Sequence, residues 1–168
     1  MRRKHHYGIR DAFEDSLAGL VEFYTQSEPI IERGVMGGKW EMAAVVGFGA
    51  DSLRGSSILL GNPNDLRLLS TTPVHDPLDY LGELNNQTVG RMRNKLARCN
   101  LRVQIGTPIT LSGQGLALGI VDGSSSNWEV RWPGGKLFAS LAICVAPDLR
   151  ITDTNTIETI EEGSITLF

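Results

Sequence analysis

A short run of polar residues near the middle of the chain has the spacing of a functional helix surface. On a helical wheel of roughly 100° per residue, Asp79, Glu83 and Asn86 fall within about 60° of one another, and Gly90 lies in the same sector one turn later. Carboxylates can pair with a cation of a partner, while a neutral carboxamide can accept a hydrogen bond from water without repelling anionic oxygens. The pattern predicts an exposed row of two carboxylates and one carboxamide, followed by a glycine that has no side chain.

The helix that must carry this row is predicted over residues 76–99. Its opposite side is apolar, with six side chains within roughly 80° of one another. These are Leu78, Leu81, Val89, Met92, Leu96 and Cys99. Four residues of the helix, Gly82, Asn85, Asn86 and Gly90, are poor helix formers and together cost on the order of 2–3 kcal/mol relative to good ones. A solvent-exposed helix surface with no functional role would usually carry residues of higher helix propensity. We therefore interpret the polar row as a contact surface.

The rest of the chain reads as one further long helix and a series of strands. An apolar stripe predicts a helix over residues 11–25, and residues 42–49 and 53–60 form a predicted hairpin. Residues 27–40 read as a loop or irregular edge, and a short helix is expected from Asn62 to about Leu69. Five further strands are expected at 101–105, 109–111, 116–121, 128–132 and 137–145. Helices separated from runs of hairpin strands indicate an α+β domain.

Length and composition exclude several classes of protein. The chain has 168 residues, 41% of them hydrophobic, and a net charge of −3, which predicts one globular domain and argues against a dedicated nucleic-acid binder. No apolar stretch is long enough to span a membrane, so we expect no membrane contact. Residues 1–8 read as a basic tail without a signal peptide, which predicts a cytoplasmic protein in which Cys99 and Cys144 are reduced, small core residues.

Metal binding by this chain is not expected. His75 lies near Asp76 and Asp79, but this spacing matches no zinc signature.

The polar row resembles the signature of the CheC/CheX/FliY phosphatases. The carriers of the resemblance are Asp79-x-x-x-Glu83-x-x-Asn86 and, 22 residues after Asn86, Pro108. Residues 42–122 match best, and CheX members are the most similar. The resemblance implies a single domain over residues 1–168 with an α+β, CheC-like fold: an antiparallel β-sheet built from hairpins, with two long helices packed on it. Residues 148–168 form a C-terminal extension that the resemblance does not cover.

The resemblance also implies a function, the hydrolysis of the phosphoaspartate of a CheY-like response regulator in chemotaxis or another two-component pathway. Asn86 would position the attacking water, Glu83 would pair with a lysine of the partner, and Asp79 and Gly90 would complete the binding surface. The chain itself would bind no cofactor, because the response regulator supplies Mg²⁺. In the first helix, Leu17 stands three residues after Glu14, so a single site is expected. The resemblance further implies a homodimer joined through β-structure.

Two other functions and one other assembly stay open from the sequence. The same fold could dock on a response regulator or a flagellar switch component without catalysing hydrolysis. A third reading is a small-molecule-binding domain with a pocket under the hairpins. The apolar runs at 116–121 and 137–145 would invite aggregation if left as an exposed edge or face. A dimer interface or the segment 151–168 could cover them.

Overall fold

The computed structural model describes residues 8–34, 38–69, 74–118, 125–147 and 149. The helices are α1 (Ile9–Thr25), α2 (Pro63–Arg67) and α3 (Pro77–Ala97). The strands are β1 (Ile30–Arg33), β2 (Trp40–Ala50), β3 (Leu53–Gly61), β4 (Gln104–Ile105), β5 (Ile109–Leu116), β6 (Ser125–Trp132) and β7 (Gly135–Val145). Within these ranges, no helix has the length and apolar character needed to cross a membrane.

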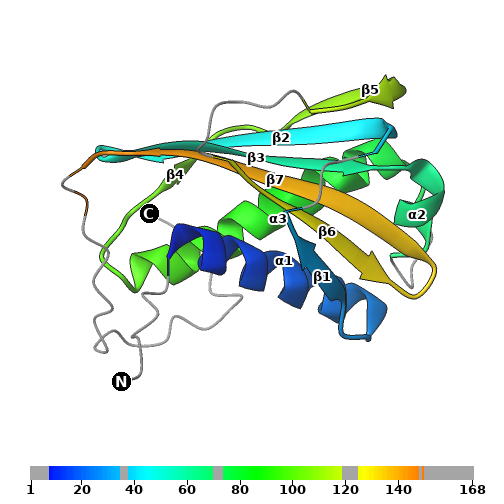
Figure 1. The fold of residues 1–168 in the computed structure, drawn as a ribbon, viewed down its shortest axis with the longest axis horizontal. Helices are drawn as coiled ribbons and strands as arrows, with labels where there is room; N and C mark the ends of the chain where they lie inside the picture. The colour runs from blue at the N-terminus through cyan, green and yellow to red at the C-terminus, as the bar shows by residue number, and fades with distance from the viewer. Residues whose placement is uncertain (1–7, 35–37, 70–73, 119–124, 148, 150–168) are drawn as a thin grey trace.

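The strands form one antiparallel sheet, and the two long helices pack on one of its faces (Figure 1). The strand order is β1-β6-β7-β3-β2-β4, and β5 pairs with β2 alongside the same edge as β4. Each of the pairs β2–β3 and β6–β7 is a hairpin of neighbouring strands. The predicted α+β class, with hairpins and two long helices, is therefore confirmed.

The core lies between the helices and the inner face of the sheet. In strand β2, Met42, Ala44, Val46 and Phe48 alternate in sequence and are buried on the inner face. From the helices, Phe13 and Leu81 are each fully buried against this layer. Because one face of β2, β3, β6 and β7 is covered in this way, burial fixes the register of these strands.

Helix α3 begins where the sequence predicts, and its predicted apolar side faces the core. The Asp76 carboxylate accepts hydrogen bonds from the backbone N–H groups of Leu78 and Asp79, at 2.9 and 3.2 Å, and Pro77 occupies the first turn. Of the six residues on the predicted apolar side, five are buried and Leu78 is partly buried against the core. The buried side is wider than predicted, because it also includes Leu84, and α3 packs against α1 as well as against the sheet.

Several strand assignments from the sequence were wrong or incomplete, and of the strand predicted at 101–105 only Gln104–Ile105 forms β4. The segment predicted as irregular contains the edge strand β1, which pairs with β6, and β5 continues through Gly113 as far as Leu116. Residues 117–118 are not in a strand, so the start of the strand predicted at 116–121 is wrong. The remainder of that strand and nearly all of the C-terminal extension lie outside the described residues.

The strand predicted at 137–145 is confirmed as part of β7, whereas Cys144 differs from expectation. The run at 137–145 is no edge, since β7 lies between β3 and β6. Cys144 is exposed, whereas Cys99 is buried as predicted. The alternation of side chains along β7 explains this, because Ile143 packs toward the core and its neighbour must point to the other face.

Candidate functional site

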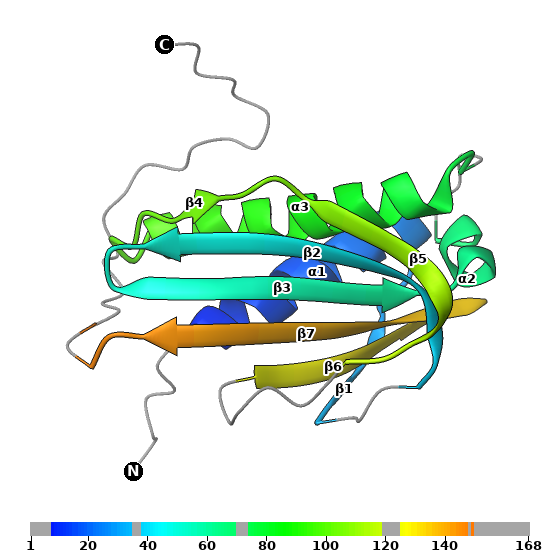
Figure 2. The same ribbon diagram turned by 90° about the horizontal axis from the view of Figure 1, so that it is seen from above.

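The four residues of the predicted row lie together on the outward side of α3. Asp79 and Glu83 are exposed, and Asn86 and Gly90 are partly exposed. A Cβ atom added at Gly90 would meet no atom within 4 Å, so the backbone there is open to an approaching surface. Seen from the outer face of the sheet, α3 lies at the margin of the molecule beside β4 and β5 (Figure 2). We call the surface formed by Asp79, Glu83, Asn86 and Gly90 the α3 ridge.

Adjacent asparagines of α3 have opposite environments. The side chain of Asn85 is fully buried, accepts a hydrogen bond from the Ser57 hydroxyl, and donates to the carbonyls of Ala44 and Ser57 at 2.8 and 3.1 Å. The Asn86 carboxamide forms no hydrogen bond to any other residue that the structure describes. Asn85 therefore ties the helix to β2 and β3, and counting it toward a contact surface was wrong.

Gly82 is also explained by packing. Its added Cβ atom would lie 2.8 Å from Cγ2 of Thr110, so the glycine lets α3 approach β5 closely. Thr110 follows Pro108 by two residues, and this contact therefore brings the segment that leads into β5 beside the ridge helix. Of the four poor helix formers, Asn86 and Gly90 are left for the surface.

Glu83 has a hydrogen-bond partner, Gln87, which is itself bonded to Tyr24, and the sequence analysis named neither contact. The Gln87 side chain donates a hydrogen bond from Nε2 to Glu83 Oε1 at 2.8 Å, and the Tyr24 phenol of α1 donates to Gln87 Oε1, also at 2.8 Å. The spacing of four residues between Glu83 and Gln87 allowed the first contact to be foreseen. The second joins residues 63 positions apart, and no local pattern signals it.

In the first helix, Glu14 is engaged by neighbouring elements. Arg33 donates from Nε and Nη2 to the two carboxylate oxygens of Glu14, at 2.6 and 2.9 Å, and the Trp128 indole donates to the same group. This hydrogen bonding and the charge of Glu14 raise the pKa of Arg33. Glu14 thus joins α1 to β1 and β6, and its carboxylate is occupied by contacts within the fold.

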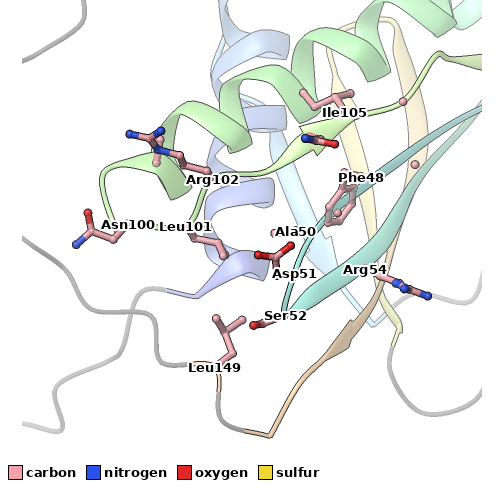
Figure 3. A pocket seen from close by; sticks show the side chains of 15 residues that line it. Phe48, Ala50, Asp51, Ser52, Arg54, Asn100, Leu101, Arg102, Ile105 and Leu149 are labelled. Carbon is pink, nitrogen blue, oxygen red and sulfur yellow. The ribbon is translucent and has the colours of Figure 1, made fainter.

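The structure offers little support for a metal or small-molecule site. Among the residues it describes, no group of three His, Cys, Asp or Glu side chains gathers to hold an ion. A pocket of about 1070 Å³ lies where the β2–β3 turn meets the segment after α3, and none of the ridge residues lines it. Figure 3 shows its two arginines, Arg54 and Arg102, pointing toward opposite sides. The polar groups of this pocket do not converge on one point.

Comparison with solved structures identifies the fold. A CheC-like superfamily protein from Shewanella sp. PV-4 superposes with a TM-score of 0.68 at 18% identity, covering 81% of this chain and 97% of that one. The fold is that of the CheC-like chemotaxis proteins. CheX from Vibrio vulnificus has a TM-score of 0.66 at 18% identity, over 81% of this chain and 99% of that one.

Two further solved structures are similar to this chain. CheX of Borrelia burgdorferi, solved as a complex with CheY, BeF3 and Mg²⁺, has a TM-score of 0.64 at 17% identity, over 82% of this chain and 99% of that one. The FliM middle domain from H. pylori is more distant, with a TM-score of 0.53 at 12% identity, over 80% of this chain and 86% of that one. No protein-family model and no curated protein matches this chain by sequence.

Proposed function

We propose that this protein is a phosphatase that hydrolyses the phosphoaspartate of a CheY-like response regulator. The observation that carries the proposal is the contrast on α3, where Asn85 is fully satisfied inside the fold and Asn86 presents an unengaged carboxamide beside Glu83. The CheC-like fold and the complex of a similar CheX protein with CheY support a response regulator as the partner.

Hydrolysis of a phosphoaspartate mainly requires that the attacking water be correctly positioned. An acyl phosphate is already activated, so water can attack phosphorus directly, the bond to the aspartate oxygen breaks, and inorganic phosphate leaves together with the regenerated carboxylate. Asn86 accepts a hydrogen bond from the attacking water through Oδ1 and, being neutral, approaches the phosphoryl oxygens without repulsion. Holding the water in line can lower the barrier by several kcal/mol.

Glu83 fixes the register of the two proteins. Its exposed carboxylate pairs with a lysine of the regulator, and Asp79 extends the acidic surface one turn toward the start of α3. Gly90 leaves room for close approach beyond Asn86.

Mg²⁺ comes with the regulator in this proposal. Asp76 is engaged as the cap of α3, and Glu83 is bonded to Gln87, so no convergent carboxylates for the ion occur among the residues that the structure describes. When bound by the partner, Mg²⁺ neutralises charge on the phosphoryl oxygens.

The experiment that tests the proposal follows phosphate release from phosphorylated CheY-like domains with and without this protein. We expect acceleration by the parent chain and the spontaneous rate with Asn86→Ala. Asn94→Ala, at an exposed asparagine about two turns further along α3, is the matched control and keeps the parental rate. Equal rates for the parent and the Asn86 variant would contradict the assignment.

The second candidate is a module that docks on a regulator or a flagellar switch component without hydrolysis. The distant likeness to the FliM middle domain favours it. Stable binding of a CheY-like domain with no loss of its phosphate would select this function over the first.

A homodimer joined through β-structure completes the proposal. The observation that supports a dimer is made on β5. Its large apolar side chains Ile109 and Leu111 are 61% and 52% exposed. They pair with Val45 and Ala43 and so lie on the outer face of the sheet, away from α3.

A further inference from the structure

The side chain of Glu83 is held from one side only. Gln87, one turn further along α3, donates to Oε1 of the carboxylate, and no hydrogen bond to Oε2 occurs among the described residues. An exposed pair of this kind on a single helix contributes only a few tenths of a kcal/mol. The hydrogen bond from Gln87 alone would therefore leave the Glu83 side chain free to change rotamer.

A second hydrogen bond, from a residue of α1, holds Gln87 itself in place. Tyr24 is partly buried, and its hydroxyl donates to Oε1 of Gln87. Its ring packs edge-on against Phe23 and Tyr80, with centroids 5.3 and 5.9 Å apart. A carboxamide oxygen can only accept and its nitrogen can only donate, so the bond from Tyr24 turns the amide nitrogen of Gln87 toward Glu83.

We propose that Gln87, oriented by Tyr24, is a positioning residue that presents the Glu83 carboxylate to the cation of the partner. The inference rests on the proposed function, in which Glu83 is the anchor. The contact from Gln87 occupies one carboxylate oxygen and leaves the other to accept from the partner's ammonium group. Because the glutamate rotamer is selected before binding, less side-chain entropy is lost in the complex. Helix α1 thereby takes part in recognition although it has no Glu-x-x-Asn pair of its own.

Steady-state kinetics with a phosphorylated CheY-like domain test this role. Gln87→Met keeps the length of the side chain and removes both hydrogen bonds, and Tyr24→Phe keeps the ring and removes the donor. For each variant we expect kcat/KM to fall about threefold to tenfold, mainly through a higher KM, with kcat within about twofold of the parent. Gln104→Met, the same change on the exposed face of β4, is the matched control and keeps parental constants.

A double-mutant cycle separates positioning from a general structural effect. In a Glu83→Ala background, Gln87→Met has nothing left to position and is expected to cause no further loss. Losses that multiply in the double variant would overturn the inference. The Gln87 side-chain amide resonances of the full chain give a direct readout, and both Glu83→Ala and Tyr24→Phe are expected to shift them.

The outcomes distinguish this inference from the function on which it rests. Parental KM for both Gln87→Met and Tyr24→Phe, with an inactive Asn86→Ala variant, would overturn the positioning role alone. A parent chain that releases no phosphate would overturn the proposed function and the positioning role together.

Discussion

Two neighbouring asparagines show how helix phase assigns roles. Asn85 and Asn86 have the same chemistry, and the rotation of about 100° between them sends one into the sheet and the other to the surface. The buried carboxamide uses both its donor and its acceptor capacity on β2 and β3. The outer one keeps that capacity for another molecule, and substitutions at the two positions should therefore have opposite consequences.

Replacing the surface residues should affect activity and spare stability. For Asn86→Ala and Glu83→Ala we expect phosphatase rates to fall by about two orders of magnitude or more. The free energy of unfolding should stay within about 1 kcal/mol of the parent, because alanine is the better helix former and little buried contact is lost. Phosphate release and thermal melting of the same samples measure both effects. An activity loss matched by a large loss of stability would argue against a direct role.

Asn85→Ala is the matched change on the other side of the same helix. It removes three hydrogen bonds and leaves the Ser57 hydroxyl buried without that partner. We expect the free energy of unfolding to fall by about 2–4 kcal/mol, measured by denaturant titration. A variant as stable as the parent would mean that this network does not hold α3 on the sheet.

The residues of the candidate site were only partly readable from the sequence. The period of α3 predicted that Asp79, Glu83 and Asn86 share a side, because hydrophobic periodicity fixes the phase of a long helix. It could not show that Asn85 belongs to the core, since a polar residue next to the apolar side has no signature of burial. It also could not show Tyr24 at Gln87, which depends on the packing of two helices.

At the scale of the element, the two glycines of α3 serve different contacts. Gly90→Ala adds a methyl group in open space and should stabilise the helix by about 0.5–1 kcal/mol while weakening binding of the regulator. Gly82→Ala places the same methyl group against Thr110 and should be less stable than Gly90→Ala by about 1–3 kcal/mol. Melting curves of both variants and one binding titration check the pair. Equal melting temperatures would contradict the packing role of Gly82.

The strands were predictable where they are half-buried and were missed where they are exposed. Strands β2 and β3 have long apolar segments and a clear turn, and both appear at the predicted places. Strand β1 has no buried residue, and β5 is exposed along most of its length and contains Gly113 and Gly115. Edge strands of this kind lack the alternation that a single sequence displays, because only pairing with β6 or β2 defines them.

At the scale of the whole molecule, the proposed function assigns the metal ion to the response regulator. The chain alone should bind no Mg²⁺ or Zn²⁺ in a titration, whereas chelator should abolish phosphate release from the mixture. Restoring Mg²⁺ should return the full rate, because in the proposed function the partner binds the ion. Stoichiometric zinc or iron in the purified protein would contradict this division of roles.

The oligomeric state depends on whether the exposed apolar residues on the outer face of the sheet are buried by a second copy of the chain. Part of that face is covered within the chain, where Trp40 packs with Ala43, Leu60 and Phe138 in a second buried cluster. Ile109 and Leu111 extend the apolar surface to the edge strand and are left exposed. An exposed apolar edge favours self-association, and a two-fold interface would bury each of these residues twice.

Light scattering at micromolar concentration measures the outcome. We expect a mass about twice the 18.3 kDa of one chain for the parent. Leu111→Lys places a charge in the proposed interface and should give a monomer, whereas Gln104→Lys, on the exposed face of β4, should keep the parental mass. The ridge on α3 lies on the helical side of the sheet, so monomeric Leu111→Lys should still release phosphate at the parental rate per chain. A soluble parent with a mass near 18.3 kDa would reject the dimer and leave the segment 151–168 as the candidate cover for this edge.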